Sequence, residues 1–324
     1  SFPGWGIEPF HMDRIAFSLF GVDVNWYGLI ITCGMILAVL YALWHAKHEC
    51  VKSDDIIDLA LALIFCGVIG ARLYYVIMEF DQYLVSGGTF LQNLGGTLYN
   101  CIAIWNGGLA IYGGVIGAAI GIIIYTRIKK LSLGALLDLV SIGFLIGQSI
   151  GRWGNFMNRE AFGGETDLPW RMRVWLSEFQ YAEVHPTFLY ESLWNLVGLL
   201  LLLFVVSRAR RFDGENACFY FLWYGVGRFW IEGLREDSLY LGPIRISQLV
   251  AAITCFIAVA VLVFNLFRYH DPKKLYAVEA ADALAAEEAQ KAETAEKSKE
   301  RWNKVITKIF PKKGVGGSEF PYVL

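Results

Sequence analysis

The chain has 324 residues, of which 56% are hydrophobic and only 18% are charged. Its mean hydropathy of +0.46 excludes an ordinary soluble globular protein. The formal net charge of −2 says little about partners, because it averages an apolar body with a charged tail. We expect no nucleic-acid partner.

Apolar stretches long enough to cross a bilayer recur along most of the chain. They predict an all-α polytopic membrane protein with seven transmembrane helices, at about 25–46, 56–78, 107–126, 133–151, 187–206, 217–234 and 247–268. No signal-peptide pattern precedes the first span, so we expect that span to act as the insertion signal. The predicted domains are an extracytoplasmic segment at 1–24, a membrane catalytic domain at 25–268 and a charged cytoplasmic tail at 269–324.

The positive charges predict which ends of the spans face the cytoplasm. Lysines and arginines follow the first, third, fifth and seventh spans, at positions 47, 52, 127, 129, 130, 208, 210, 211, 273 and 274. Because basic loops stay on the cytoplasmic side, the chain is predicted to be N-out and C-in. The opposite side has no lysine, but it has arginines at 152, 159, 171, 173, 235 and 245. A guanidinium fork suits bidentate contact with phosphate or carboxylate, so these arginines indicate binding.

Residues 79–106 make too long an outer connection to be a simple turn. They lack lysine and arginine and are rich in Gly, Leu, Tyr and Phe. Since aromatic and apolar residues favour the headgroup boundary, we interpret this segment as an interfacial arm on the outer surface, with a plain loop as the alternative.

The tail and the cysteines point to no chemistry. Residues 279–302 are typical of a solvated helix, and the basic stretch 304–313 is either the end of that helix or a contact with anionic lipid. We interpret the Gly-Ser-Glu-Phe run at 317–320 as a cloning remnant. The six cysteines have no CxxC spacing, so we expect neither a disulfide framework, nor a metal site, nor a cofactor.

Polar side chains gather at one depth of the predicted bundle, in its outer part. They come from five spans and are Tyr27, Arg72, Arg152, Glu191, Arg228 and Glu232. Ionisable groups within a bilayer are costly, so they predict a functional site, here a cavity for an anionic lipid headgroup. The spacing of Tyr224, Arg228, Glu232 and Arg235 places all four on one helix face. The alternative is a structural pair of Arg228 with Glu232, which would also orient the arginine.

Residues 151–163 read Gly-Arg-Trp-Gly-Asn-Phe-Met-Asn-Arg-Glu-Ala-Phe-Gly and directly follow the predicted fourth span, at the start of an outer loop over about 151–186. Asn155 and Asn158 offer amide donors to glycerol hydroxyls or ester carbonyls, and Gly163 permits close backbone approach. An ordinary cytoplasmic arginine-rich loop is the alternative, which the predicted topology disfavours. His185, at the mouth of the fifth span, is of a kind that is more often a structural hydrogen-bond partner than a catalyst.

At these residues the chain resembles the bacterial prolipoprotein diacylglyceryl transferase family. The family signature G-R-x-G-N-F-x-N-x-E-x-x-G is matched at every fixed position of 151–163. Further matches over about 20–268 are Trp26-Tyr27-Gly28, Gly70-Ala71-Arg72-Leu73, Gly107-Gly108, Gly113-Gly114, His185-Pro186-Thr187, Tyr190-Glu191, Tyr224-Gly225, Arg228, Glu232 and Arg235. The resemblance does not include the tail.

The resemblance implies an enzyme of the bacterial inner membrane whose active site faces the outer leaflet. Such enzymes move the diacylglyceryl group of phosphatidylglycerol to the lipobox cysteine thiol in the signal peptide of a prolipoprotein. A thioether forms and glycerol 1-phosphate is released. The implied partners are phosphatidylglycerol, the prolipoprotein and membrane lipids, and no metal or nucleotide is implied.

The reaction gives the matched residues expected roles. Arg152 and Arg228 would neutralise the charge on the departing phosphate. Many family members have His where this chain has Tyr112, so the base for the thiol stays open among Tyr112, Glu160, His185 and the lipid phosphate. The expected catalytic residues are Arg152, Arg228, Tyr112, Glu160 and Tyr27. The expected substrate-binding residues are Arg72, Asn155, Asn158, Gly163, His185, Glu191, Tyr224, Glu232 and Arg235.

The main alternative function is a lipid or solute transporter with an outer-leaflet site for an anion. A transporter usually needs access from both faces, whereas the predicted polar groups lie in one leaflet and no broken-helix repeat is evident. A CDP-alcohol phosphotransferase would need a cluster of aspartates to bind a metal, and the sequence has no such cluster.

Overall fold

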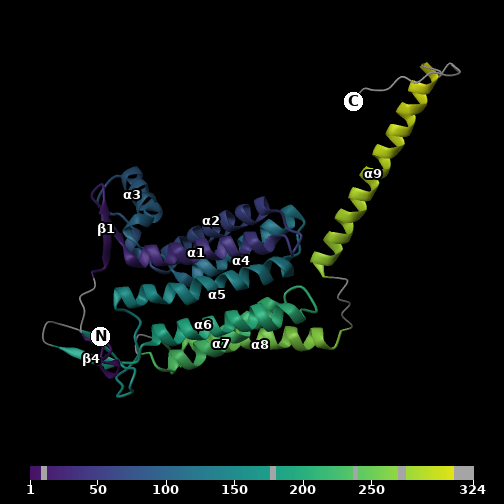
Figure 1. Cartoon of the computed structure of the whole chain (residues 1–324). Coiled ribbons are helices and arrows are strands. Elements are labelled where there is room, and N and C mark those ends of the chain that lie inside the picture. The colour runs from purple at the N-terminus through teal and green to yellow at the C-terminus, as the bar shows by residue number, and fades with distance from the viewer. Residues whose placement is uncertain (9–12, 176–179, 236–239, 269–274, 310–324) are drawn as a thin grey trace. The chain divides into compact units, whose positions relative to one another are not determined.

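The computed structural model describes residues 1–8, 13–175, 180–235, 240–268 and 275–309. The chain divides into two compact units, Ser1–Ala277 and Val278–Leu324. The first unit is built mainly of long helices, which are labelled in Figure 1. They are α1 (Trp26–Ala46), α2 (Ser53–Met78), α4 (Ile111–Lys129), α5 (Leu133–Asn158), α6 (Thr187–Leu201), α7 (Glu215–Gly233) and α8 (Ile246–Leu266). A π-helical segment (Leu202–Val206) and a 3-10 turn (Ser207–Ala209) prolong α6.

Six helices in the described part of the chain are long and apolar enough to cross a membrane, namely α1, α2, α4, α5, α8 and α6 with its prolongation to Ala209. They lie at six of the seven predicted spans, as expected for a mostly helical, polytopic membrane protein. Helix α7 lies where the sixth span was predicted but is not among the six. Its charged residues, Glu215, Arg228 and Glu232, lower its hydropathy. The seventh span and the orientation remain predictions.

The fourth span is longer than predicted. Its expected end at residue 151 is too early, because α5 continues to Asn158 and contains most of the 151–163 signature. Gly151 and Gly154 do not end the helix, since tertiary packing overrides their low helix propensity. The helix ends at Arg159, which has a φ of 56° in the left-handed region.

In the described part of the chain, three antiparallel hairpins precede α1, α6 and α8, a feature that an all-α prediction omitted. They pair β1 (Ile15–Leu19) with β2 (Val22–Asn25), β3 (Met172–Trp175) with β4 (Tyr181–Val184), and β5 (Tyr240–Leu241) with β6 (Ile244–Arg245). Such short strands escape prediction because two to five residues carry little alternation. Helix direction alternates along the chain, so all three hairpins lie at the end of the bundle where α1, α6 and α8 begin.

Helix α5 is central, with contacts to α1, α6 and α7, while α2 pairs with α4 and α7 with α8 (Figure 1). Helices α2 and α4 approach closely because Gly113 has no side chain: a Cβ there would lie 2.4 Å from the Gly70 carbonyl oxygen. A reciprocal pair joins α6 to α7. The indole of Trp194 donates to the Trp223 carbonyl at 2.9 Å, the indole of Trp223 donates to the Trp194 carbonyl at 2.8 Å, and their ring centroids are 4.4 Å apart.

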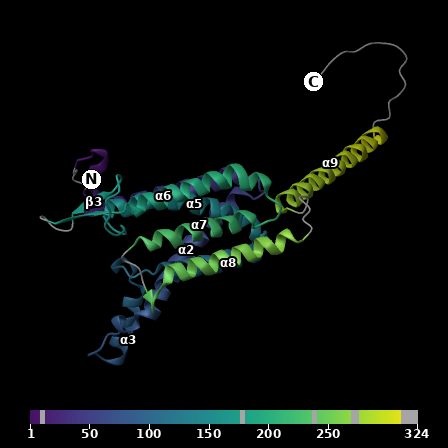
Figure 2. The same cartoon turned by 90° about the horizontal axis from the view of Figure 1, so that it is seen from below.

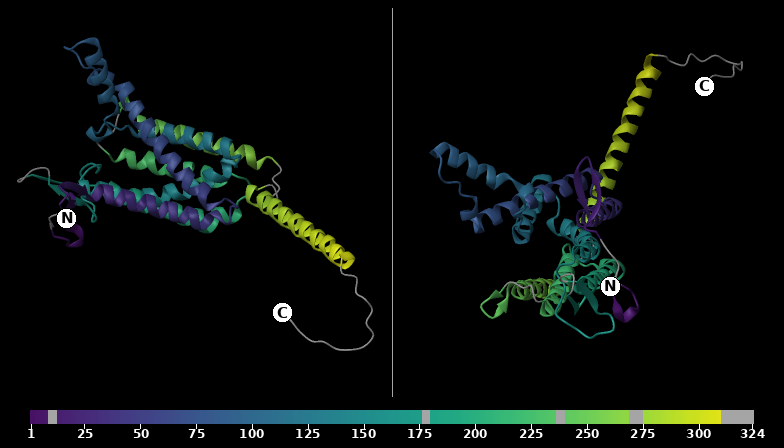
Figure 3. Two further views of the ribbon diagram at one scale, coloured as in Figure 1. Left: turned by 90° about the horizontal axis from the view of Figure 1, so that it is seen from above. Right: turned by 90° about the vertical axis from the view of Figure 1, so that its left-hand side faces the viewer.

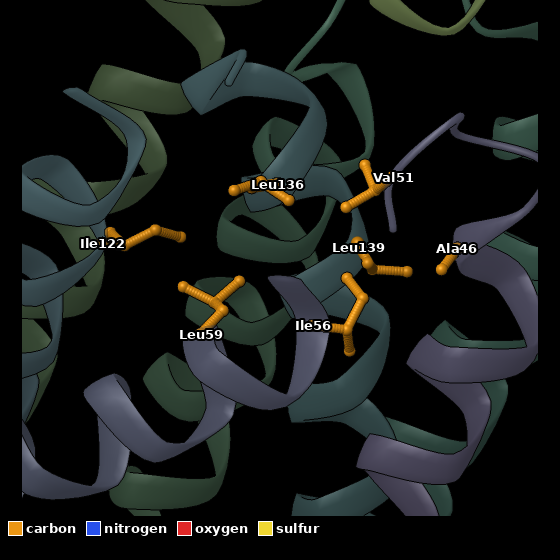
Figure 4. Packing of buried hydrophobic residues seen from close by; sticks show 7 residues of the cluster. All are labelled: Ala46, Val51, Ile56, Leu59, Ile122, Leu136 and Leu139. Carbon is orange, nitrogen blue, oxygen red and sulfur yellow. The ribbon is translucent and has the colours of Figure 1, made fainter. Parts of the chain in front are cut away.

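One apolar core fills the end of the bundle where α1 finishes and α2 begins. Figure 4 shows its members, Ala46, Val51, Ile56, Leu59, Ile122, Leu136 and Leu139. At the same end lies a charged group that we call the Glu49 cluster: Glu49, Arg210, Asp138 and His45. Arg210 binds both carboxylate oxygens of Glu49 at 2.8 Å and lies 3.5 Å from Asp138. The carboxylate of Asp138 also accepts from the backbone N–H groups of Gly214 and Ala217, which fixes the start of α7.

The predicted arm contains helix α3 (Phe90–Ile102), flanked by 3-10 turns at Phe80–Tyr83 and Ile104–Asn106. Thr89 and Gln92 form a capping box at its start. Figures 2 and 3 show α3 extending away from the packed helices. Its exposed apolar side chains are Phe90, Leu91, Leu94, Leu98, Tyr99 and Ile102. An amphipathic helix of this kind suits a membrane interface, although its placement on the outer surface stays a prediction.

The second unit contains most of helix α9 (Tyr276–Ile309). Helix α9 is largely exposed, and ion pairs of Lys291 with Glu287 and of Lys297 with Glu293 support it at spacings of four. It covers the stretch 279–302 that was predicted to be helical. The suggested remnant at 317–320 lies outside the described residues.

Candidate active site

Three arginine side chains converge on one buried carboxylate at the end of the bundle that contains the hairpins. The carboxylate is Glu191, in the second turn of α6, with 4% of its surface exposed. Arg152 Nη2 lies 2.5 Å from Oε2, while Arg228 Nη1 and Arg235 Nη1 lie 3.1 Å and 3.7 Å from Oε1. Because these arginines come from α5, α7 and the residues after α7, Glu191 ties three segments together. With Glu232 they form what we call the Glu191 cluster.

A second buried carboxylate completes the cluster. Glu232 is 2% exposed and pairs with Arg228 Nη2 at 2.7 Å, one turn along α7. Arg228 is therefore held between two carboxylates on two helices, and the structural pair considered from the sequence is present. The guanidinium of Arg245 donates to the backbone carbonyl of Glu232, a contact that sequence reasoning did not assign. The only signal for Arg245 was its place among arginines on a side without lysine.

Arg152 and Arg228 are less enclosed than the carboxylate that they share. Their side chains are 20% and 19% exposed, against 5% for that of Glu191. Each guanidinium has five N–H donors, and the carboxylate contacts engage only part of that set. Arginines held by a buried acid and still reachable from outside are suited to bind an anion through two parallel hydrogen bonds.

A chain of hydrogen bonds within the signature links Arg152 to Glu160. Arg152 Nη1 donates to Asn155 Oδ1 at 3.3 Å, and the amides of Asn155 and Asn158 donate to Glu160 Oε1 at 2.9 Å and 3.3 Å. The sequence predicted these amides as donors to lipid, and here they orient an exposed carboxylate. Glu160 is placed by two residues from the last turn of α5.

The first residues of α1 pack against the same stretch of α5. A Cβ at Gly154 would lie only 2.9 Å from Cδ2 of Tyr27, so glycine at this position lets the tyrosine ring lie against the helix. This contact brings Tyr27 close to the predicted site.

Gly163 and His185 build the loop beside the cluster. The Gly163 N–H donates to the His185 carbonyl at 3.0 Å, and a Cβ on Gly163 would lie 2.8 Å from the Leu234 carbonyl oxygen. His185 Nδ1 lies 3.2 Å from the Tyr190 hydroxyl. Burial lowers the pKa of His185 below its ordinary value, so the ring is neutral at pH 7. In these contacts both residues hold the loop in place.

Two further predicted residues have partners outside the Glu191 cluster, and a third, Tyr112, lies at the start of α4. Tyr224 stacks on Tyr220, with ring centroids 5.8 Å apart. Arg72 is 7% exposed and donates to backbone carbonyls between residues 100 and 108. Tyr112 is the second residue of α4 and is partly exposed. Within the described residues, neither Tyr112 nor Arg72 makes a hydrogen bond or ion pair with the Glu191 cluster.

Comparisons with known proteins place this site in a family. The model of the prolipoprotein diacylglyceryl transferase family matches residues 14–264. Three curated relatives carry the name phosphatidylglycerol–prolipoprotein diacylglyceryl transferase. The protein of Clostridioides difficile is 43% identical over 75% of this chain and 91% of its own, that of Finegoldia magna 44% over 74% and 90%, and that of Listeria welshimeri 39% over 83% and 95%.

The matched region contains α1 to α7 and all but the last two residues of α8, and with them every residue of the Glu191 cluster, whereas α9 lies outside it. A family match over more than half of the chain, together with relatives that align over most of their own length, leaves one assignment. The chain belongs to the prolipoprotein diacylglyceryl transferases, a family of transferases of lipoprotein biosynthesis.

Proposed function

We propose that this protein transfers the diacylglyceryl group of phosphatidylglycerol to the lipobox cysteine thiol in the signal peptide of a prolipoprotein. The cysteine sulfur forms a bond to the glyceryl CH₂ carbon that bears the phosphate, and the bond from that carbon to the phosphate oxygen breaks. The electron pair leaves with the oxygen, so the products are a thioether and glycerol 1-phosphate. The names of the relatives and the family membership support this substrate pair.

The observation that carries the proposal is the convergence of Arg152 and Arg228 on Glu191. A phosphate diester becomes a monoester as the carbon–oxygen bond breaks, so negative charge grows on the departing group. Two guanidinium groups that are already oriented by buried carboxylates stabilise that charge without reorganising. We assign phosphate binding to Arg152 and Arg228, and orientation of these arginines to Glu191 and Glu232.

The thiol proton needs an acceptor, and the chain offers three groups besides the lipid phosphate. Glu160 is an exposed carboxylate held by Asn155 and Asn158. His185 lies beside the cluster, and burial lowers its pKa, which favours the neutral ring. Tyr112 stands where many family members have His, and its hydroxyl is the third candidate.

We also propose that α7 crosses the membrane as the sixth of seven spans, with the N-terminus outside. Two of its charged residues, Arg228 and Glu232, are paired with each other, and Arg228 is also paired with Glu191 on α6. The Glu191 cluster then faces the outer leaflet of the inner membrane. Exported prolipoproteins and phosphatidylglycerol are both accessible from that side.

The decisive experiment uses purified full-length protein in vesicles that contain phosphatidylglycerol labelled in its acyl chains, with a lipobox peptide. We expect the label to appear on the peptide as a thioether, together with release of glycerol 1-phosphate. A peptide with serine in place of the lipobox cysteine is the control. Movement of labelled lipid between leaflets without thioether formation would favour the transporter instead.

A further inference from the structure

Arg72 joins the interfacial arm to the start of α4. It lies six residues before the end of α2, and its side chain is buried, as is that of the preceding Ala71. Its guanidinium donates to five backbone carbonyls: Nε to Cys101 at 2.9 Å, Nη1 to Gly107 at 2.6 Å and Gly108 at 2.9 Å, and Nη2 to Asn100 at 2.7 Å and Ala103 at 3.2 Å.

These contacts engage the whole donor set of the side chain. A guanidinium has one Nε–H and four Nη–H donors, about five in all, which equals the number of carbonyls bound. The ring of Tyr83 covers the guanidinium, with its centroid 5.0 Å from Cζ. Arg72 thus differs from Arg152 and Arg228, whose side chains are bound by carboxylates and remain partly exposed. Its geometry suits holding the backbone better than binding a phosphate.

The five carbonyls belong to two successive pieces of chain. Asn100, Cys101 and Ala103 are at the end of α3, where unpaired carbonyls carry partial negative charge and favour a nearby cation. The other two belong to Gly107 and Gly108, which have φ angles of 85° and 77°. A Cβ on Gly108 would lie 2.6 Å from Arg72 Nη1, so this turn fits closely around the guanidinium.

The turn leads directly into α4. The Ala110 N–H donates to the Ala71 carbonyl at 3.1 Å, so the chain is fixed to α2 on both sides of Leu109. Helix α4 begins at Ile111, and Tyr112 is its second residue. The position of Tyr112 therefore depends on the turn that Arg72 holds.

We propose that Arg72 is a positioning residue for the transfer reaction. It fastens the end of α3 and the Gly107–Gly108 turn to α2, and in this way it sets the place of Tyr112. A displacement of about 1 Å in a reacting group lowers a rate by about 100-fold, so a loosened turn is enough to slow transfer. Only the link to turnover rests on the proposed function, since the anchoring itself is independent of any substrate.

The test compares Arg72→Gln and Arg72→Lys with wild type in lipid nanodiscs that contain phosphatidylglycerol. Amide hydrogen exchange at residues 100–110 measures the anchoring, and steady-state transfer to a lipobox peptide measures the chemistry. For Arg72→Gln we expect exchange at 100–110 to rise at least about tenfold, with no change in α6. We expect kcat to fall about 100-fold and KM for phosphatidylglycerol to stay within about twofold.

Arg72→Lys should lie between wild type and Arg72→Gln, because an ammonium group has about three donors for five carbonyls. Arg127→Gln, an exposed arginine at the other end of α4, is the matched control and should change neither readout. A raised KM with unchanged exchange would overturn the proposal and make Arg72 a phosphate ligand. Unchanged exchange and unchanged kcat would overturn it as well. Absence of transfer by the wild type would contradict the proposed function alone, because the exchange readout needs no turnover.

Discussion

Each end of the helical bundle contains a buried cluster of arginine and carboxylate, but the proportions are reversed. In the Glu49 cluster two carboxylates share Arg210, whose side chain is 9% exposed and binds Glu49 with both terminal nitrogens. In the Glu191 cluster three arginines share one glutamate, and two of them are about twice as exposed as Arg210. The first arrangement is a closed structural pair. The second gathers positive charge around an acid and suits a negatively charged ligand. The ratio of arginines to carboxylates therefore distinguishes a structural ion pair from a binding site.

The largest effect is expected from removing the guanidinium fork at the Glu191 cluster. Arg152→Lys and Arg228→Lys keep the charge but lose bidentate contact with phosphate, so turnover should fall about 100-fold or more. Thioether formation by folded protein, normalised to protein quantity in the membrane, measures this. Transfer at the wild-type rate by either variant would exclude specific phosphate recognition by that residue.

Replacing the shared acid tests whether orientation matters as well as charge. Glu191→Gln removes the negative charge that Arg152, Arg228 and Arg235 share, while Arg228 keeps its pairing with Glu232. We expect loss of about 3 kcal/mol of stability and a fall in turnover of about tenfold or more. Thermal denaturation in detergent and the transfer assay measure the two effects separately. If stability falls while turnover per folded molecule is unchanged, Glu191 is a structural anchor only.

Tyr112 lies outside both clusters, and substitutions there test which group accepts the thiol proton. Tyr112→Phe keeps the ring and removes the hydroxyl, and we expect a fall in turnover of about 100-fold if that group handles the thiol proton. Tyr112→His, which restores the residue found in many family members, should retain much of the activity. Near-normal transfer by the Phe variant would leave Glu160, His185 and the lipid phosphate as the remaining acceptors.

The Glu49 cluster predicts the opposite pattern. Arg210→Lys replaces two short contacts by one and should reduce stability by about 2 kcal/mol, because both partners are buried. Turnover per folded molecule should not change, since the cluster lies at the other end of the bundle. Thermal denaturation and the transfer assay again measure both quantities. A selective loss of turnover would mean that the two ends of the bundle are coupled.

The smallest effect concerns the partly exposed Glu183 in the β3–β4 hairpin, which is bound by Arg173 in the hairpin and by Arg171 directly before it. Hydrogen bonds from Arg173 and Arg171 hold the pKa of Glu183 below its ordinary value of 4.5. The folded state therefore binds fewer protons than the unfolded state, and the stabilising contribution is present above pH 4.5 and declines as the pH falls through the lowered value. The protection factors of the amides at 172–175 and 181–184, which are corrected for intrinsic exchange, should fall on acidification below pH 4.5. Glu183→Gln should remove this pH dependence.

Six of the seven predicted spans were accessible from sequence because hydropathy decides them. Six spans coincide with helices that are long and apolar enough to cross a membrane. Glu191 was predicted as a substrate ligand, yet its contact with three arginines depends on how α5, α6 and α7 are rotated against one another. No periodicity within one helix contains that information. Sequence spacing does predict the pair of Arg228 with Glu232, because both lie on one helix.

Arg72 illustrates a different limit. Its place in the last third of a predicted span was readable, but its partners are backbone carbonyls some 30 residues further on, and these have no side-chain signal. The hairpins were missed for another reason: their strands are too short to show a clear alternation of polar and apolar residues. The extension of α5 through Gly151 and Gly154 depends on packing against α1, which helix propensity does not include.

The reciprocal contact of Trp194 with Trp223 bears on how the protein enters the bilayer. Helix α7 alone is a poor candidate for insertion, because Arg228 and Glu232 would have to leave water unpaired with α6. The two indoles fasten it to α6, which also supplies the acid that Arg228 meets. We therefore expect α6 and α7 to leave the translocation channel together as one hairpin, in which Arg228 is already paired with Glu191 and Glu232.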